Sequence, residues 1–273
     1  MTNTVAVAMA ASALDAVDAR VLMRHALGVD VAWLIAHATD ALTAGQQAAF
    51  SALAARRHAG EPVAYITGTR EFYGREFAVT PAVLIPRPET ELLVEWALEK
   101  ITPGAEARVL DLGTGSGCIA ISIACERPCA QVLAVDQSES ALDVARSNAQ
   151  RHTIGNVGFL HSDWFSALGT QRFDCIVSNP PYIAADDAHL AQGDLRFEPA
   201  GALAAGSDGL DAIRLIVAQA PHYLHAGGWL AIEHGYDQAA RCRQLLQAAG
   251  FTQVFSQRDL AGIERVSGGC LDA

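Results

Sequence analysis

Apolar residues recur at helical spacing in the N-terminal part of the chain, between residue 12 and about residue 58. Leu14 and Val17, for example, share one face of a helix, because residues three and four apart are neighbours on its surface. Thr43, followed three residues later by Gln46, is a typical start signal for a further helix. The pattern predicts three or four short helices that pack into a small bundle.

A different pattern follows this helical region. Residues 65–79 combine aromatic and β-branched side chains around Gly68 and Gly74, which predicts a β-hairpin. Residues 89–101 then have the alternation of an amphipathic helix, which begins directly after Pro88.

From Arg108 onward, short apolar segments alternate with helical ones. Such alternation predicts an α/β fold, in which helices cover both faces of a mostly parallel sheet. The pair Gly227-Gly228 is interpreted as a turn before a strand. We expect strands at residues 109–112, 131–135, 157–160, 173–178, 229–234, 252–256 and 263–267, and helices after Gly117 and at 139–150, 208–224 and 238–249.

Composition is consistent with a globular enzyme that has a full core. The chain has 273 residues, of which 51% are hydrophobic and 18% are charged. Because it has no uninterrupted apolar stretch of membrane-spanning length, we expect no membrane span. The apolar N-terminus has no basic segment before it and is followed by Asp15 and Asp18, which argues against a signal peptide.

Charge and cysteine usage exclude several classes of site. The formal net charge is −11, and the chain has no run of basic residues, which disfavours non-specific binding to a nucleic-acid duplex. The six cysteines include no C-x-x-C pair, and the nine histidines are not paired at metal-ligand spacing. We therefore expect neither disulfides nor a metal site. We also expect the protein to reside in a reducing cytoplasm.

The strand expected at residues 173–178 runs directly into Asn179-Pro180-Pro181-Tyr182. Each proline fixes its φ at about −65° and lacks a backbone N–H, and the residue before a proline is held extended. The side-chain oxygen of Asn179 and the carbonyl oxygen of Pro180 then remain as two acceptors for a planar –NH2 group, with an aromatic ring nearby. The alternative is a rigid loop without chemistry, since X-Pro pairs commonly mark turns.

A glycine-rich loop follows the strand expected at residues 109–112, and it reads Gly113-Thr114-Gly115-Ser116-Gly117. Glycine allows a sharp turn and a close approach of a ligand to the main chain, and free N–H groups at a helix start favour an anionic or polar group. The sixth position of a dinucleotide pattern would be Cys118, so G-x-G-x-x-G is absent. The loop therefore fits a ligand without a pyrophosphate, or else a plain tight turn.

Acidic residues follow the next two expected strands. Asp136, at the end of the second strand, is placed to accept hydrogen bonds from ribose hydroxyls. Its alternative role is to cap the helix expected at residues 139–150. Asp163 and Trp164 follow the third strand and together can bind a purine by a hydrogen bond and by stacking, whereas Trp164 taken alone can equally be a core residue.

All of these segments follow strand ends, and ligands of such sheets bind beyond the carboxyl ends of the strands. The sequence therefore predicts one site at this edge. We predict that the cofactor contacts Gly113, Thr114, Gly115, Ser116, Gly117, Asp136, Asp163, Trp164 and Asn179, that the substrate contacts Asn179, Pro180, Pro181 and Tyr182, and that Asn179, Pro180 and Tyr182 are catalytic.

Taken together, these residues resemble the class I S-adenosylmethionine-dependent methyltransferases. The match narrows to the HemK-like protein-(glutamine-N5) methyltransferases that modify peptide chain release factors. It spans roughly Arg70 to the C-terminus, whereas the N-terminal third is similar by helical character alone. Further matching segments are residues 70–77, 83–91, 197–199, 202–203, 206–210 and 233–238.

The resemblance implies a Rossmann-like methyltransferase domain with a seven-stranded sheet at residues 87–273, a β-hairpin linker at 63–86 and a helical substrate-recognition domain at 1–62. It also implies S-adenosyl-L-methionine as the cofactor, no metal, and transfer of a methyl group to the N5 amide of glutamine in the Gly-Gly-Gln loop of release factors. We expect a cytoplasmic monomer that acts in translation termination and binds neither nucleic acid stably nor membranes.

Three alternatives remain at this point. The Asn-Pro-Pro-Tyr motif also resembles N6-adenine DNA methyltransferases and N2-guanine RNA methyltransferases, although the acidic net charge favours a protein substrate. A sister activity on a ribosomal protein is the nearest rival, and residues 87–91 favour release factors by resemblance only. A non-catalytic S-adenosylmethionine-binding scaffold is disfavoured by the intact motifs.

Overall fold

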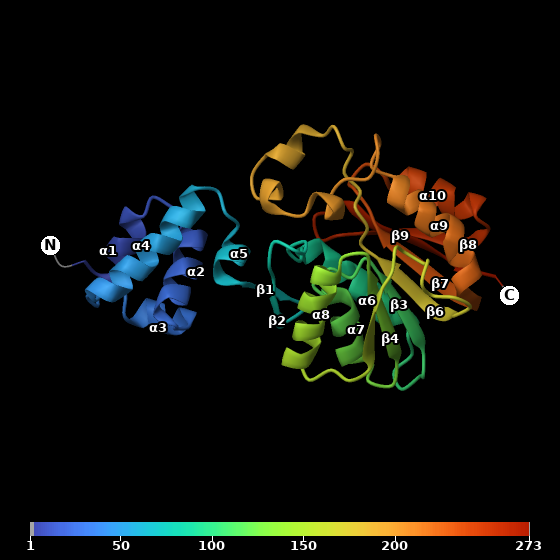
Figure 1. The fold of residues 1–273 in the computed structure, drawn as a ribbon, viewed down its shortest axis with the longest axis horizontal. Helices are drawn as coiled ribbons and strands as arrows, with labels where there is room; N and C mark the ends of the chain where they lie inside the picture. The colour runs from blue at the N-terminus through green and yellow to red at the C-terminus, as the bar shows by residue number, and fades with distance from the viewer. Residues whose placement is uncertain (1–2, 273) are drawn as a thin grey trace. The chain divides into compact units, whose positions relative to one another are not determined.

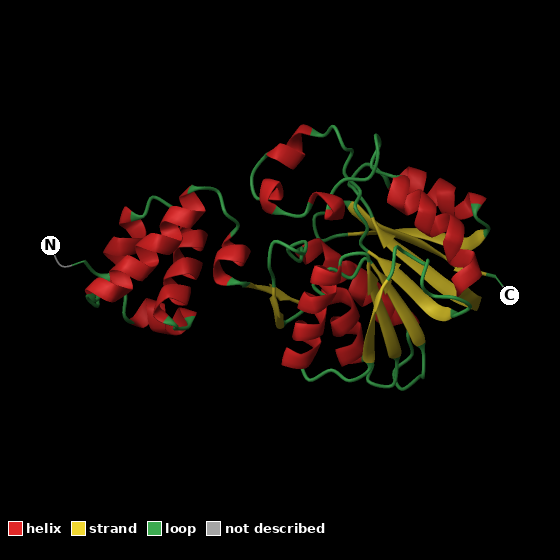
Figure 2. Ribbon diagram, viewed as in Figure 1, coloured by secondary structure: helices red, strands yellow, loops and turns green. Residues whose placement is uncertain are grey.

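The computed structural model describes residues 3–272, which form two compact units. The first unit runs to Thr69 and also contains Gly193–Phe197, and the second contains Arg70–Gln192 and the chain from Glu198 onward. The first unit is helical, whereas the second combines a large sheet with helices (Figure 1, Figure 2).

The first unit is a small helical bundle, as the apolar spacing predicts. Leu22, Met23 and Phe50 are fully buried in its core. The side chains of Thr43 and Gln46 form the expected capping box at the start of the fourth helix. The helices are α1 (Val5–Ala11), α2 (Ala16–Leu27), α3 (Val31–Ala36), α4 (Ala44–His58) and α5 (Val63–Thr67).

The expected hairpin is present, but the segment assigned to the linker begins with a helix. Strands β1 (Thr69–Phe72) and β2 (Arg75–Ala78) are joined by Tyr73 and Gly74, which both have positive φ, as in a type I′ turn. Residues 63–67 are instead helix α5, whose Ile66 packs into the helical core. The aromatic and β-branched residues at this position predicted a hairpin. They form a helix instead, because its apolar side chains are buried in the helical core.

The second unit is built on a seven-stranded sheet with the order β5-β4-β3-β6-β7-β9-β8. Neighbouring strands from β5 to β7 are parallel, and β9 is antiparallel to both β7 and β8. The mostly parallel sheet is thus confirmed. Its strands are β3 (Arg108–Leu112), β4 (Gln131–Asp136), β5 (Val157–His161), β6 (Phe173–Ser178), β7 (Leu224–Glu233), β8 (Phe251–Arg258) and β9 (Glu264–Leu271).

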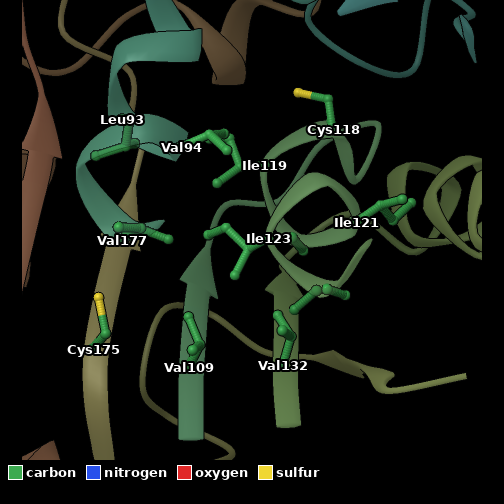
Figure 3. Packing of buried hydrophobic residues seen from close by; sticks show 14 of the residues in the cluster. Leu93, Val94, Val109, Cys118, Ile119, Ile121, Ile123, Val132, Cys175 and Val177 are labelled. Carbon is green, nitrogen blue, oxygen red and sulfur yellow. The ribbon is translucent and has the colours of Figure 1, made fainter. Parts of the chain in front are cut away.

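Helices cover both faces of this sheet because the central strands are apolar on both sides. Val109 of β3 faces α6 (Glu91–Lys100) and α7 (Cys118–Glu126), in the cluster that Figure 3 shows. Its neighbour Leu110 packs on the opposite face, with α9 (Asp211–Tyr223) and α10 (Ala239–Ala248). Helix α8 (Glu139–Arg151) packs beside α7 (Figure 1).

The turn predicted at Gly227-Gly228 lies inside β7 and does not precede it. Phe173 of β6 pairs with Leu224, and Cys175 pairs with Trp229, so residues 225–228 stand opposite Asp174 alone. This bulge uses the positive φ of Gly227, and the strand therefore begins five residues earlier than the expected residue 229.

None of the helices within residues 3–272 has the length and hydropathy that a membrane crossing requires. The cysteines are free thiols, and Cys118, Cys175, Cys242 and Cys270 are buried.

A fully buried asparagine joins the hairpin to the glycine-rich loop. Asn148 of α8 accepts a hydrogen bond from the backbone N–H of Ala78 at 2.7 Å and donates to the carbonyl oxygen of Ala78 at 3.0 Å. It also donates to the carbonyl oxygen of Ser116 at 2.9 Å. One side chain therefore satisfies three backbone groups from two distant segments.

We predict that Asn148→Ala lowers the free energy of unfolding by about 2–5 kcal/mol, because it leaves buried backbone groups without partners. Denaturant unfolding of both proteins measures the difference, and Gln150→Ala, an exposed position on the same helix, serves as the control. Equal loss of stability in the two variants would contradict this role of Asn148.

Candidate functional site

A cleft opens at the carboxyl edge of the sheet, within the second unit. Its empty volume is about 1030 Å³, part of which is open to solvent. It is lined by the glycine-rich loop after β3, the segments after β4, β5 and β6, the stretch before α6, and the loop around η4 (Ala200–Ala202). The edge predicted from strand ends is therefore the edge that carries the cleft.

The glycine-rich loop turns sharply between β3 and α7. Gly113, Gly115 and Gly117 all have positive φ. At Gly117 (φ 81°) a Cβ would lie 2.9 Å from Cδ1 of Ile121 and 3.1 Å from Cβ of Ala145, so a side chain there has no room. Gly117 itself does not line the cleft and instead permits the close packing of α7 against α8.

Asp136 holds this loop against the end of β4. Its Oδ2 accepts from the N–H of Gly115 at 2.9 Å, and its Oδ1 accepts from the N–H of Ser138 at 2.9 Å. The carboxylate also lines the cleft. Asp136 therefore faces the ligand site and supports the turn before α8, but it does not cap this helix, because the N-cap is Ser138, whose side chain accepts from the N–H of Ala141.

Asp111, in β3, is an acid that the sequence analysis did not select. It is fully buried, and its Oδ2 accepts from the Thr114 hydroxyl at 2.7 Å. Within residues 3–272 its Oδ1 has no hydrogen-bond partner. Burial raises the pKa of Asp111 from 3.8 to about 7, although the hydrogen bond from Thr114 opposes the shift.

Asp163 and Trp164 reach the cleft from the end of β5, as expected. Trp164 adopts a positive φ of 49°, which is uncommon for a bulky side chain. Its ring lies close to Gly113, where a Cβ would be 3.6 Å away, and it also packs against the core on that face. Trp164 therefore combines the core role and the cleft role that its sequence position left open.

Asn179 lines the cleft at the end of β6, where its amide is held in one orientation. Its Nδ2 donates to the Thr90 hydroxyl at 3.1 Å. Its Oδ1 is shielded from water and has no hydrogen-bond partner among the residues that the structure describes. A buried acceptor without a donor lowers the stability of the folded protein by about 1–3 kcal/mol, unless a ligand supplies the donor.

Tyr182 does not line the cleft. Its hydroxyl donates to Oε1 of Glu233 at 3.2 Å, and its carbonyl oxygen accepts from Nε2 of Gln238 at 3.0 Å. Glu233 ends β7 and is only 1% exposed. Burial raises the pKa of Glu233 from 4.5 to about 7, and the nearby hydroxyls of Thr90 and Tyr182 oppose this shift. Burial likewise raises the pKa of Tyr182.

Two segments outside the sheet line the cleft and are joined by an ion pair whose acidic partner is buried. Arg87, which lines the cleft, pairs with Glu198, whose carboxylate also accepts from the N–H of Ile85 at 2.9 Å. The side chain of Glu198 has no exposed surface. This contact ties the stretch before α6 to the loop that carries Pro199 and Ala202.

Most of the site residues predicted from sequence meet in this cleft. The residues that line it are Gly113, Thr114, Gly115, Ser116, Asp136, Asp163, Trp164, Asn179 and Pro181, whereas Gly117, Pro180 and Tyr182 do not. Sequence reasoning missed Thr90, which lines the cleft, and Glu233, which does not line it but accepts from the hydroxyl of Tyr182. A signal for Glu233 was present, because it is an acid at the end of an expected apolar strand of the same sheet.

Comparison with protein-family models gives two matches. Residues 5–68 match the PrmC N-terminal domain, and residues 88–202 match the methyltransferase small domain.

Curated relatives match nearly the whole chain. The release factor glutamine methyltransferase of Burkholderia pseudomallei is 58% identical over 98% of this chain and 96% of its own length. That of Bordetella pertussis is 57% identical over 94% of this chain and 96% of its own length.

Among solved structures, the T. thermophilus 16S rRNA N2 G1207 methyltransferase, in complex with AdoMet and guanosine, has a TM-score of 0.54. It is 22% identical and covers 74% of this chain and 49% of its own, so this likeness concerns the fold alone.

The buried acids predict how stability depends on pH. Because the pKa of Asp111 rises from 3.8 to about 7 on folding, the folded state binds more protons than the unfolded state between these values. The contribution of Asp111 to the free energy of unfolding therefore falls as pH rises through this window, by up to about 1.4 kcal/mol per pH unit. Removing this group in Asp111→Asn should therefore make the free energy of unfolding, followed in denaturant titrations at several pH values, fall less or rise more with pH than in the unchanged protein.

The exposed Asp186→Asn serves as the matched control, and its slope should equal that of the unchanged protein. A slope in Asp111→Asn identical to that of the unchanged protein would show that Asp111 is ionised in both states.

Proposed function

The chain belongs to the release factor glutamine methyltransferase family, and on this basis we propose that it methylates the N5 amide of a glutamine in peptide chain release factors. The methyl donor is S-adenosylmethionine, and the target is the glutamine of the Gly-Gly-Gln loop. The observation that carries the proposal is the Asn179 amide, held by Thr90 with its Oδ1 unpaired at the end of β6.

The cleft has the features that the cofactor requires. S-adenosylmethionine supplies an electrophilic methyl group on a sulfonium centre when it is bound. We assign its contacts to Asp136, whose carboxylate suits ribose hydroxyls, and to Asp163 and Trp164, which suit a purine. The remaining contacts come from the main chain of Gly113, Thr114, Gly115 and Ser116, with Gly117 fixing the shape of the loop, and from Asn179.

Asn179 and Pro180 position the substrate amide. A carboxamide nitrogen is a weak nucleophile, because its lone pair is delocalised into the carbonyl group. Oδ1 of Asn179, which lines the cleft, accepts one N–H. We assign the other N–H to the carbonyl oxygen of Pro180, which lies between the cleft-lining residues Asn179 and Pro181 although it does not line the cleft itself. This pair orients the nitrogen and favours pyramidal character as the new bond forms. Such positioning can lower the barrier by about 7–11 kcal/mol, and acceptors that face developing positive charge lower it further.

Tyr182 and Pro181 shape the turn that carries these acceptors. The hydroxyl of Tyr182 is committed to Glu233, so we assign Tyr182 to holding the turn and not to a contact with the substrate amide through its hydroxyl. Pro181 lines the cleft and gives the substrate side chain an apolar wall.

Mass spectrometry of a release factor after incubation with the enzyme and S-adenosylmethionine tests the proposal. We expect one added methyl group on the glutamine of its Gly-Gly-Gln loop. Methylation of a ribosomal protein, or of DNA or RNA, with an unmodified release factor would contradict it. The net charge of −11 argues against the nucleic-acid outcome.

We further propose that the first unit recognises the protein partner in the cytoplasm, where release factors act, and that it carries no chemistry. Every residue assigned to the site lies outside this unit. From residue 3 onward, its surface exposes the large apolar side chains Val7, Val17, Val31 and Ile35. Exposed apolar groups of this kind contribute to protein interfaces when they are covered by a partner.

Replacing all four of these residues with serine should raise KM for an intact release factor about tenfold or more, because apolar contact area is lost. Methylation of a short Gly-Gly-Gln peptide should be unchanged and already poor, since remote binding energy is absent there. Leu260→Ser, at a fully exposed site of the second unit, is the control. An unchanged KM in the fourfold variant would remove these side chains from recognition.

Asn179→Ala should reduce kcat about 100-fold or more, while the affinity for S-adenosylmethionine falls little, because Asn179 acts mainly on the amide in the transition state. Asp136→Ala should do the opposite and weaken cofactor binding by about 1.5–3 kcal/mol, as expected for lost hydrogen bonds to a charged group. Steady-state kinetics and calorimetry separate the two effects. Near-normal turnover of Asn179→Ala would refute the assigned role of its Oδ1.

A further inference from the structure

The last residue of the Asn-Pro-Pro-Tyr turn is held through its main chain by a buried side-chain amide. Nε2 of Gln238, at the start of α10, donates to the carbonyl oxygen of Tyr182 at 3.0 Å. Oε1 of the same side chain accepts from the N–H of Gly235 at 2.8 Å. An inverted amide would set its –NH2 group against that N–H, so the side chain has one favourable orientation. Gln238 is only 7% exposed.

Gly209 approaches the same carbonyl group from another part of the chain. It has a φ of 72°, and a Cβ added to it would lie 2.2 Å from the carbonyl oxygen of Tyr182 and 2.9 Å from Nε2 of Gln238. Both distances are far shorter than a van der Waals contact, so only glycine leaves room for this hydrogen bond. The neighbouring Asp208 forms ion pairs with α9 and α10, which hold the segment in place.

The position of Tyr182 restricts the direction of the carbonyl group of Pro180. The turn is also held where it begins, because β6 pairs with β7 as far as Ser178. Between these two ends the peptide bonds are planar and each proline has a fixed φ. Rotation about the Cα–C bond of Pro180 would redirect its carbonyl oxygen, but it would also move Pro181 and Tyr182. Holding Tyr182 therefore opposes this rotation.

We propose that Gln238 and Gly209 are positioning residues for methyl transfer, which keep the carbonyl oxygen of Pro180 directed at the substrate amide by fixing the carbonyl group of Tyr182. The inference deepens the proposed function and rests on it, because Pro180 is one of the two acceptors assigned there. Neither positioning residue lines the cleft. Most cofactor contacts are assigned to the loops after β3, β4 and β5, so cofactor affinity should depend little on them.

Two substitutions disturb the carbonyl group of Tyr182 in different ways. Gln238→Glu keeps the shape of the side chain, but an ionised carboxylate has no hydrogen to donate and repels the carbonyl oxygen. Gly209→Ala adds the Cβ for which there is no room. Each should lower kcat on an intact release factor about 10- to 100-fold, because small misplacements of reacting groups are costly. Affinity for S-adenosylmethionine, measured by calorimetry, should stay within about twofold.

Gly250→Ala is the matched control for a merely structural effect. Gly250 follows α10 in the same unit and also has a positive φ, of 86°. Apart from its chain neighbours, a Cβ added there would have no described atom within 4 Å. Both alanine variants carry backbone strain, so thermal melting should show a loss of stability in each. Only Gly209→Ala should lose kcat.

If melting shows that Gln238→Glu does not fold, Gln238→Met replaces it, because methionine removes the hydrogen bonds at similar length without adding a charge. The same fall in kcat is expected. Normal kcat in the folded Gln238 variant, or equal kcat in Gly209→Ala and Gly250→Ala, would overturn the positioning role. A loss of S-adenosylmethionine affinity as large as the loss of kcat would also overturn it, since the whole cleft would then be disturbed.

Failure of the unchanged enzyme to methylate the release factor would instead contradict the proposed function. The two failures are distinguishable, because the first concerns only the variants and the second is seen before any residue is changed.

Discussion

The site depends on one constraint, which is that a buried amide at the end of a strand must expose a single kind of hydrogen-bonding group to a ligand. Parallel pairing on both sides fixes β6 as far as Ser178, and the two prolines that follow end the ladder. Thr90 then holds Nδ2 of Asn179, while Oδ1 stays unpaired. A buried acceptor without a donor lowers the stability of the folded protein by about 1–3 kcal/mol. The residues around Oδ1 must therefore keep it in place until a substrate supplies the donor.

The order of the strands explains why cofactor and substrate meet at this point. The chain runs from β3 outward to β4 and β5, and then returns to β6 on the other side of β3. Loops therefore diverge between β3 and β6, as they do at the ligand sites of open α/β sheets. The glycine-rich loop, with its anchor Asp136, lies toward β4, and Asn179 lies at the end of β6. Cofactor and substrate groups thus approach one edge from neighbouring strands.

Local patterns in the sequence were sufficient to predict where most strands and helices lie and which residues follow the strand ends. They were insufficient to predict the contacts that residues far apart in the chain make across the fold. Thr90 and Asn179 are 89 residues apart, Tyr182 and Glu233 are 51 apart, and Ala78 and Asn148 are 70 apart. Such pairs are created by strand order and helix packing, so no spacing rule identifies them. Helix α5 and the bulge in β7 were missed for a related reason, since core burial and strand pairing override short-range propensity.

The most direct test of the account is the affinity of the enzyme for a release factor in which the target glutamine is replaced by glutamate. Calorimetry in the presence of S-adenosylhomocysteine compares this variant with the unchanged factor. A carboxylate has no hydrogen to donate, so two acceptors that face it are left unpaired and repel its charge. We expect the glutamate variant to bind about tenfold more weakly, or weaker still. Equal affinity for the two factors would show that Asn179 and Pro180 do not recognise the substrate –NH2 group, and it would contradict the central claim.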